Sequence, residues 1–127
     1  PYNELIQKYR ESDIALHAES FESQYSDYTR LSFSTKIVDC LQCGAAVLAV
    51  GPKNNAGITY LEREKAAVCC TDANAIGSSM KVLIDDLPYW QKQAELCIQR
   101  NHDPAVNKKQ MELDFHNVIN SSKRSAQ

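Results

Sequence analysis

The sequence predicts an α/β fold, in which a Rossmann-like parallel sheet is flanked by helices and extra helices follow at the C-terminus. Short apolar runs alternate with segments of helical periodicity, which is typical of a doubly wound sheet. Residues 45–50 are apolar at every position, as a parallel strand covered by helices on both faces requires. Because 127 residues suffice for one core, we expect residues 1–120 to form a single domain and residues 121–127 to be a disordered polar tail.

The N-terminal part of the chain predicts a helix, a strand and a long loop, in that order. Asn3 can cap a short helix, because apolar residues recur at helical spacing behind it. Residues 14–17 form a short apolar run ending in His17, which predicts a strand. The polar segment 19–32 predicts a loop, and a loop of that length in a compact domain is usually functional or mobile.

The middle of the chain repeats a helix–strand alternation. A helix is expected to begin at Ser32 or Ser34 and to end at Gln42, with Gly44 at the position that favours a left-handed residue. Its apolar face is formed by Phe33, Ile37, Cys40 and Leu41. After the strand at 45–50, residues 57–65 predict a helix and residues 66–70 a third strand.

Three helices are predicted in the last third. The first is capped by Thr71 or Asp72, the second opens at Pro88, and the third starts at Asp103-Pro104. The apolar stripe of the third helix comprises Val106, Met111, Phe115, Val118 and Ile119. Three strands are few for a free-standing doubly wound sheet, so we expect either a preceding strand–helix unit or an exposed sheet edge.

Composition excludes several classes of protein. A formal net charge of −2 provides no basic surface for nucleic acid or an anionic membrane. The longest apolar run, residues 45–50, is far too short to span a bilayer, and the first residues do not open a secretory signal. The chain does not begin with Met, so we expect a domain excised from a longer cytoplasmic protein.

Five cysteines are present, and their odd number and apolar surroundings favour reduced thiols packed as small hydrophobic residues. Cys40 and Cys43 form a C-x-x-C pair, and Cys69 and Cys70 follow at a distance. A zinc site normally adds a second spaced pair or histidines. Zinc or thiol-redox chemistry is therefore the least favoured hypothesis.

The candidate chemistry lies at the carboxyl ends of the strands, where ligands bind in open α/β sheets. The loop after the first strand leads directly into a helix that begins with Ser34, Thr35 and Lys36. A helix start presents N–H groups that bind phosphate, to which two hydroxyls and Lys36 would contribute. Arg30 lies close by in sequence and adds positive charge. Asp39, one turn along, can accept hydrogen bonds from ribose hydroxyls, as acidic residues do in dinucleotide folds.

A purely structural interpretation of these residues stays open. Ser34 or Thr35 can serve only as a helix cap, and Lys36 and Asp39 can form an ordinary surface pair. A single histidine at the end of a strand, such as His17, is more often structural than catalytic. Composition and spacing by themselves indicate only an anion site at a helix start.

The segment 30–50, which reads RLSFSTKIVDCLQCGAAVLAV, resembles the donor-site segment of GT-B glycosyltransferases of the large retaining family 4, the "group 1" type. In that family a Ser/Thr-Lys opens a helix, an acidic residue follows, and a Gly pattern leads into a buried strand. The segment 12–17, SDIALH, is similar to the strand that enters the same site. The resemblance covers about residues 9–86, with looser helical similarity to residue 119.

The resemblance implies roles for individual residues. Lys36 and Arg30 would be catalytic, stabilising the diphosphate charge without a metal or other cofactor. The substrate-binding set would be Arg30, Ser34, Thr35, Lys36 and Asp39, with Asp39 on the ribose. The family usually carries a Glu eight residues before the ribose-binding acid, where this chain has Leu31. Glu19 and Glu22 in the preceding loop are weak substitutes.

The resemblance also implies a whole enzyme around this domain. It would be a retaining hexosyltransferase that transfers a sugar from a nucleotide-diphospho-sugar to an acceptor hydroxyl in polysaccharide or glycoconjugate synthesis. Its partner would be an N-terminal acceptor-binding domain, without which the fragment is expected to be inactive. The full-length enzyme would be cytoplasmic and associate peripherally with the inner membrane face. The main alternative is a non-enzymatic doubly wound module for signalling or interaction.

Overall fold

The computed structural model describes the backbone of residues 2–125, and their side chains except at 23, 26, 29 and 122–125. Its sheet has three parallel strands in the order β1 (Ile14–Ala18), β2 (Ala46–Val50) and β3 (Val68–Cys70). Leu48 of β2 is paired with Leu16 on one side and with Val68 on the other. The α/β class predicted from the alternating pattern is confirmed. Within the described residues β1 and β3 are the edge strands of the sheet.

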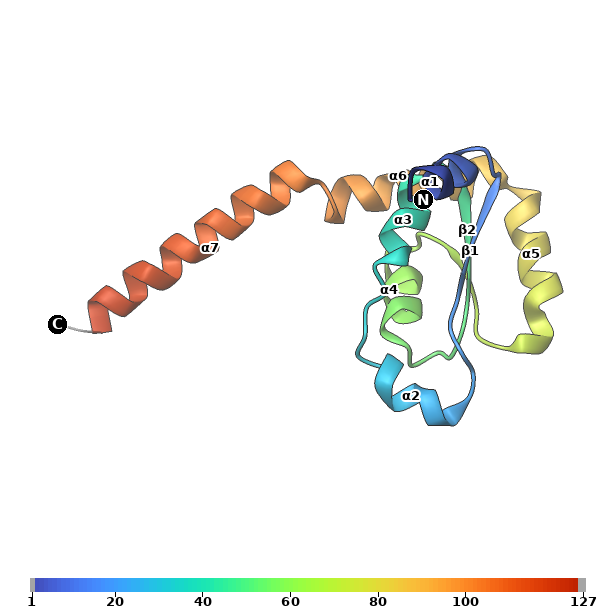
Figure 1. Ribbon diagram of the computed structural model, residues 1–127, viewed down its shortest axis with the longest axis horizontal. Coiled ribbons are helices and arrows are strands. Elements are labelled where there is room, and N and C mark those ends of the chain that lie inside the picture. Colours follow the sequence, from blue (N-terminus) through green and yellow to red (C-terminus); the bar gives the residue numbers. More distant parts are fainter. Residues whose placement is uncertain (1, 126–127) are drawn as a thin grey trace.

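Helices surround this sheet and continue beyond it (Figure 1). They are α1 (Tyr2–Arg10), α2 (Ser23–Thr29), α3 (Lys36–Gln42), α4 (Ala56–Glu64), the 3₁₀ turn η1 (Ala73–Ala75), α5 (Ile76–Asp85), α6 (Leu87–Asn101) and α7 (Pro104–Ser125).

The core lies in two layers, one on each face of the sheet. Helices α3, α4 and α6 cover one face through Ile37, Leu41, Ile58, Leu61, Ala94 and Cys97. Helix α5 and the start of α6 cover the other face through Leu83, Met80, Leu87 and Trp90. All five residues of β2 are buried, as the uninterrupted apolar run predicted. Figure 1 shows α3 and α4 on one side of the strands and α5 on the other.

The end of α3 confirms the sequence prediction, whereas its start does not. Gly44 has φ +82°, the left-handed conformation that ends a helix and favours glycine. The structure begins α3 at Lys36; Thr35 before it has helical dihedrals and makes no capping hydrogen bond through its side chain, and the carbonyl of Ser34 accepts the N–H of Ile37 over 3.1 Å. The caps of the later helices are correct: Asp72 and Asp103 accept backbone N–H groups at the starts of η1 and α7.

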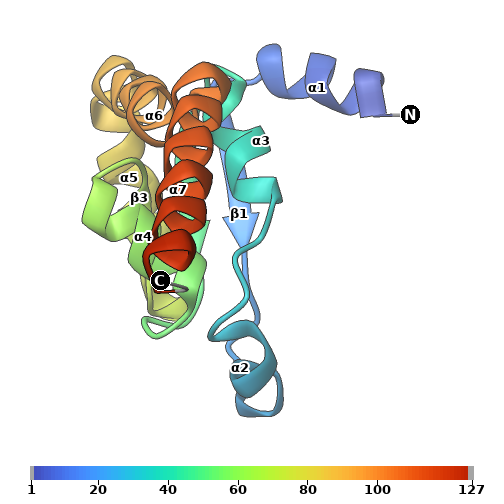
Figure 2. The same cartoon turned by 90° about the vertical axis from the view of Figure 1, so that its left-hand side faces the viewer.

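The prediction of a loop over residues 19–32 is wrong in part, because α2 (Ser23–Thr29) forms inside it. Phe21, Tyr25 and Tyr28 recur at spacings of four and three, a helical pattern that the polar composition obscured. The exposed fractions of Tyr25 and Tyr28 are 50% and 83%, so neither side chain is part of the core. Figure 2 shows α2 below the body, at the end toward which the arrow of β1 points.

Helix α7 leaves the body of the protein and projects into solvent (Figure 1). Every described side chain from Pro104 to Ser121 is exposed, including the predicted stripe, with Phe115 at 63% and Val118 at 66%. The helix continues to Ser125, so residues 121–125, which were expected to belong to a disordered tail, are helical. In the part of the chain that the structure describes, no helix is both long enough and apolar enough to cross a membrane.

Candidate functional site

Two titratable side chains meet at the carboxyl end of β1, and a lysine lies near enough for its charge to act on one of them. His17 is the fourth residue of β1, Glu19 directly follows the strand, and Lys36 opens α3. Because residues two apart on a strand point to the same face, His17 and Glu19 lie on the side of the sheet that α3 and α4 cover. This rim is the location predicted from the general rule for open α/β sheets.

His17 is the most unusual of these side chains. It is 3% exposed, and its Nε2 lies 3.2 Å from Oε1 of Glu19. The two atoms are close enough for an ion pair but not aligned for a hydrogen bond, so Nε2 is a buried polar atom without a hydrogen-bond partner. Burial lowers the pKa of His17, as does the nearby charge of Lys36, while Glu19 acts in the opposite direction. The imidazole is therefore neutral near pH 7.

Glu19 is held in place through its backbone and by a close neighbour. Its N–H donates to the carbonyl of Val50 over 2.8 Å, which joins the end of β1 to the end of β2. A Cβ on Gly51 would lie 2.9 Å from Cβ of Glu19, so a glycine is needed at this approach. The Glu19 side chain is 18% exposed, which leaves part of its carboxylate facing the rim.

The start of α4 closes the inner side of the site. Asn55 is buried, and its Oδ1 accepts the N–H groups of Gly57 and Ile58 at 2.9 and 3.1 Å. A Cβ on Gly57 would lie 2.5 Å from Cδ1 of Ile37 and 3.7 Å from Nε2 of His17. The α4 helix start therefore lies directly against α3 and His17, with its first amides bound by Asn55.

Ser34, Thr35 and Lys36 lie at the start of α3, and this helix start offers less to an anion than expected. Lys36 and Thr35 are exposed and Ser34 is half-buried. The amides of Ile37 and Val38 already donate to the carbonyls of Ser34 and Thr35, each over 3.1 Å. With seven residues, α3 also has a short dipole. Arg30 follows α2 and is exposed.

Asp39 points away from this cluster. Its Oδ1 accepts the hydroxyl of Tyr2 over 3.0 Å, which raises the pKa of that tyrosine. It lines a cavity of about 50 Å³ together with Ile6 and Arg10 of α1. Helix α1 lies at the end of the body opposite α2 (Figure 1). Ribose binding by Asp39 stays a prediction.

The cysteines pack as apolar side chains. Cys40 and Cys43 are buried, and Sγ of Cys43 donates to the carbonyl of Cys40 over 2.8 Å. Burial raises the pKa of Cys40 to about 11, and burial raises that of Cys69 to about 12, so neither forms a thiolate readily. All five are free thiols. Among the described residues no three His, Cys, Asp or Glu side chains gather where they could hold a metal.

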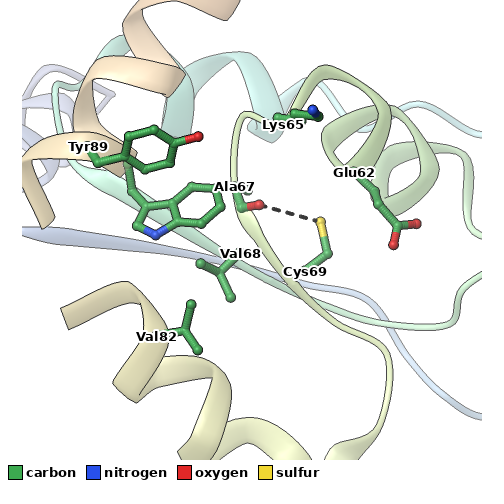
Figure 3. A pocket seen from close by; sticks show the side chains of 8 residues that line it. Glu62, Lys65, Ala67, Val68, Cys69, Val82 and Tyr89 are labelled. Carbon is green, nitrogen blue, oxygen red and sulfur yellow. Dashed lines mark hydrogen bonds between the residues drawn. The ribbon is translucent and has the colours of Figure 1, made fainter. Parts of the chain in front are cut away.

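A separate cavity of about 300 Å³ lies at the outer edge of β3 (Figure 3). Val68 and Cys69 of the strand line it, together with Val82 of α5 and Trp90 of α6. Glu62 and Lys65 are its charged residues. None of the predicted site residues contributes to it, and most of the other lining residues are apolar.

No family model, curated protein or solved structure matches the chain. The fold of the chain is a small Rossmann-like α/β domain with a three-stranded parallel sheet. Sequence reasoning treated His17 as structural and Glu19 as secondary. The available signal was their spacing of two at the end of a strand, which puts both side chains on one face.

Proposed function

We propose that this chain is the donor-binding domain of a glycosyltransferase that transfers a sugar from a nucleotide-diphospho-sugar to an acceptor hydroxyl. The observation that carries the proposal is the cluster of His17, Glu19 and Lys36 at the carboxyl ends of parallel strands. It combines a cation for the diphosphate with a carboxylate for hydroxyl groups, the two functions that a nucleotide sugar requires. The resemblance of segment 30–50 to the donor site of GT-B enzymes supports the same conclusion.

In this proposal the diphosphate is bound by protein groups alone. Lys36 and Arg30 supply positive charge at the rim, and Ser34 and Thr35 supply hydroxyl donors. Fixed cations placed where charge develops on the leaving diphosphate lower the barrier to transfer, since they need no reorganisation during the reaction. The reaction then requires neither a metal nor another cofactor.

The rest of the enzyme is part of the proposal. An N-terminal domain of the same protein would bind the acceptor and complete a retaining hexosyltransferase for polysaccharide or glycoconjugate synthesis. We expect that enzyme in the cytoplasm, peripherally at the inner membrane face. The present chain alone would bind the donor weakly and would not turn it over.

Nucleotide titration tests the proposal directly. UDP, GDP and their sugars are added to ¹⁵N-labelled protein, and amide shifts are followed to millimolar ligand. We expect shifts at residues 17–19 and 34–36, and Lys36→Ala should weaken binding about tenfold, equivalent to about 1.4 kcal/mol. Lys109→Ala, on exposed α7, is the matched control and should leave affinity unchanged. Unchanged amide shifts at residues 17–19 and 34–36 with every nucleotide would refute the proposal.

A second candidate, a non-enzymatic interaction module, is favoured by a different observation. Helix α7 exposes a stripe that includes Met111, Phe115 and Val118, and exposed apolar stripes are typical of protein contacts. The same titration separates the two candidates, because a pure interaction module would leave the rim amides unchanged.

A further inference from the structure

The buried nitrogen of His17 needs a physical explanation. Buried polar atoms in folded proteins nearly always have a hydrogen-bond partner, and exceptions often mark functional sites. Nε2 of His17 is such an exception, with Oε1 of Glu19 only 3.2 Å away but poorly aligned. Packing does not require a histidine here, since an apolar side chain would fill the same space without leaving a polar atom unpaired. The nitrogen is best explained by what it does to Glu19.

The surroundings of His17 determine its protonation. Lys36 on α3 and the positive helix start of α4 at Gly57 both oppose a charged ring. Glu19, which directly follows the strand of His17, is the group that favours a charged ring. A neutral ring with its proton on Nε2 can donate to Glu19. The other tautomer would place a ring lone pair against the carboxylate oxygen, which is repulsive.

The position of Glu19 decides what it can bind. Its carboxylate is partly exposed at the rim, and one of its oxygens faces His17. Next to a diphosphate it would repel phosphate oxygens, but its lone pairs can accept hydrogen bonds from hydroxyl groups. Asp39, the residue predicted for that role, accepts the hydroxyl of Tyr2 over 3.0 Å.

We propose that His17 is a positioning residue that, as a neutral imidazole, directs the carboxylate of Glu19 toward the hydroxyl groups of a bound nucleotide sugar. This inference rests on the proposed function. The hydroxyls belong either to the ribose or to the transferred pyranose, which present the same vicinal diol chemistry. A small rotation of either side chain aligns Nε2–H with Oε1 when the ligand binds. Glu19 then makes the ligand contact, and His17 acts only through it.

The first test needs no ligand. Ring ¹⁵N shifts of His17 are recorded by NMR across the pH range in the wild-type protein, in Glu19→Gln and in Lys36→Ala. We expect a neutral ring at pH 7 with the proton on Nε2, a lower pKa in Glu19→Gln and a higher pKa in Lys36→Ala. A proton on Nδ1, or a pKa that does not respond to Glu19→Gln, would overturn the inference.

The second test measures the affinity of inorganic pyrophosphate, UDP and UDP-glucose by calorimetry. His17→Leu and Glu19→Gln should each weaken UDP-glucose about fivefold to tenfold, as expected for a lost hydrogen bond to a charged group. His17→Gln places an amide nitrogen near the position of Nε2 and should restore affinity to within about twofold. Pyrophosphate, which has no hydroxyl diol, should bind the two His17 variants as it binds the wild-type protein, and it should bind Glu19→Gln no more weakly, because that variant removes a negative charge.

The ligands separate the possible outcomes. An equal loss with UDP and UDP-glucose assigns the contact to ribose, and a loss confined to UDP-glucose assigns it to the pyranose; both support the inference. Equal loss with pyrophosphate would show a merely structural role and overturn it. Unchanged UDP-glucose affinity in both variants would overturn the inference alone. Failure of the wild-type protein to bind any of the three ligands would overturn the proposed function and the inference together.

Discussion

Helices α5 and α7 both carry apolar residues at helical spacing, and these residues have opposite surroundings. In α5 the apolar side faces the sheet, and Leu83 is completely buried between β2, β3 and α6. In α7 the corresponding stripe faces solvent, and Phe115 is 63% exposed. Asp72 caps the turn η1 that precedes α5, and Asp103 caps α7 itself. Local sequence therefore favours a helix in both segments, whereas only α5 packs against the sheet within the described chain.

This difference shows which free energies hold the protein together. A helix in water gains little from propensity alone, and most helical stability in proteins comes from packing an apolar face. The α/β body should therefore carry the free energy of unfolding, and α7 should contribute almost nothing to it.

The largest expected effect compares Leu83→Ala with Phe115→Ala. Loss of the buried leucine should lower the free energy of unfolding by about 2–5 kcal/mol, since it removes apolar contacts and leaves a cavity. Loss of the exposed phenylalanine should change it by less than about 0.5 kcal/mol. Urea denaturation measures both. A large cost for Phe115→Ala would show that α7 is packed in solution and would end the contrast between the two regions.

A smaller effect separates two glycines within the body. Gly57→Ala should cost about 1–3 kcal/mol, because its Cβ would lie 2.5 Å from Cδ1 of Ile37 and force the α3–α4 contact apart. Gly77→Ala is the matched control on the outer side of α5, where a Cβ meets nothing within 4 Å. It should stabilise the protein by up to about 1 kcal/mol through helix propensity. Thermal unfolding distinguishes the two, and equal signs would contradict the close approach at Gly57.

The smallest effect is a pH dependence. The pKa of His17 is lowered in the folded protein from its usual 6.5, mainly by burial. The unfolded chain therefore binds a proton first as pH falls, and the free energy of unfolding decreases from about pH 6.5 down to the lowered pKa. His17→Gln should remove this part of the slope between pH 7 and pH 5. His116→Gln, exposed on α7, should keep it, and parallel curves for both variants would exclude His17 as the cause.

Much of the fold was predictable because short-range patterns determine it. The buried run at 45–50, the left-handed Gly44 and the caps Asp72 and Asp103 each follow from one local physical requirement. The start of α3 was mispredicted because serine capping competed with a first turn whose amides bond to backbone carbonyls instead. Helix α2 was missed because its aromatic spacing was hidden among polar residues.

The candidate site was predicted less well, because its geometry depends on segments far apart in the sequence. The rim and Lys36 followed from the general rule for parallel sheets. The orientation of Asp39 toward Tyr2, 37 positions away, did not follow from helix spacing. Nor did the contact of His17 with the start of α4, since only the packing of α4 on α3 brings Gly57 against it.

The sequence by itself determined most of the helices and strands, α2 excepted, and which side of most of them is apolar, because periodicity and caps act over a few residues. Tertiary structure alone decided what each apolar side meets, so that Leu83 is buried and Phe115 is exposed. It also decided that the buried imidazole of His17 faces Glu19 within hydrogen-bonding distance but out of alignment. The physical reason is that burial and electrostatic partners depend on which distant segments pack together, and local periodicity carries no information about that choice.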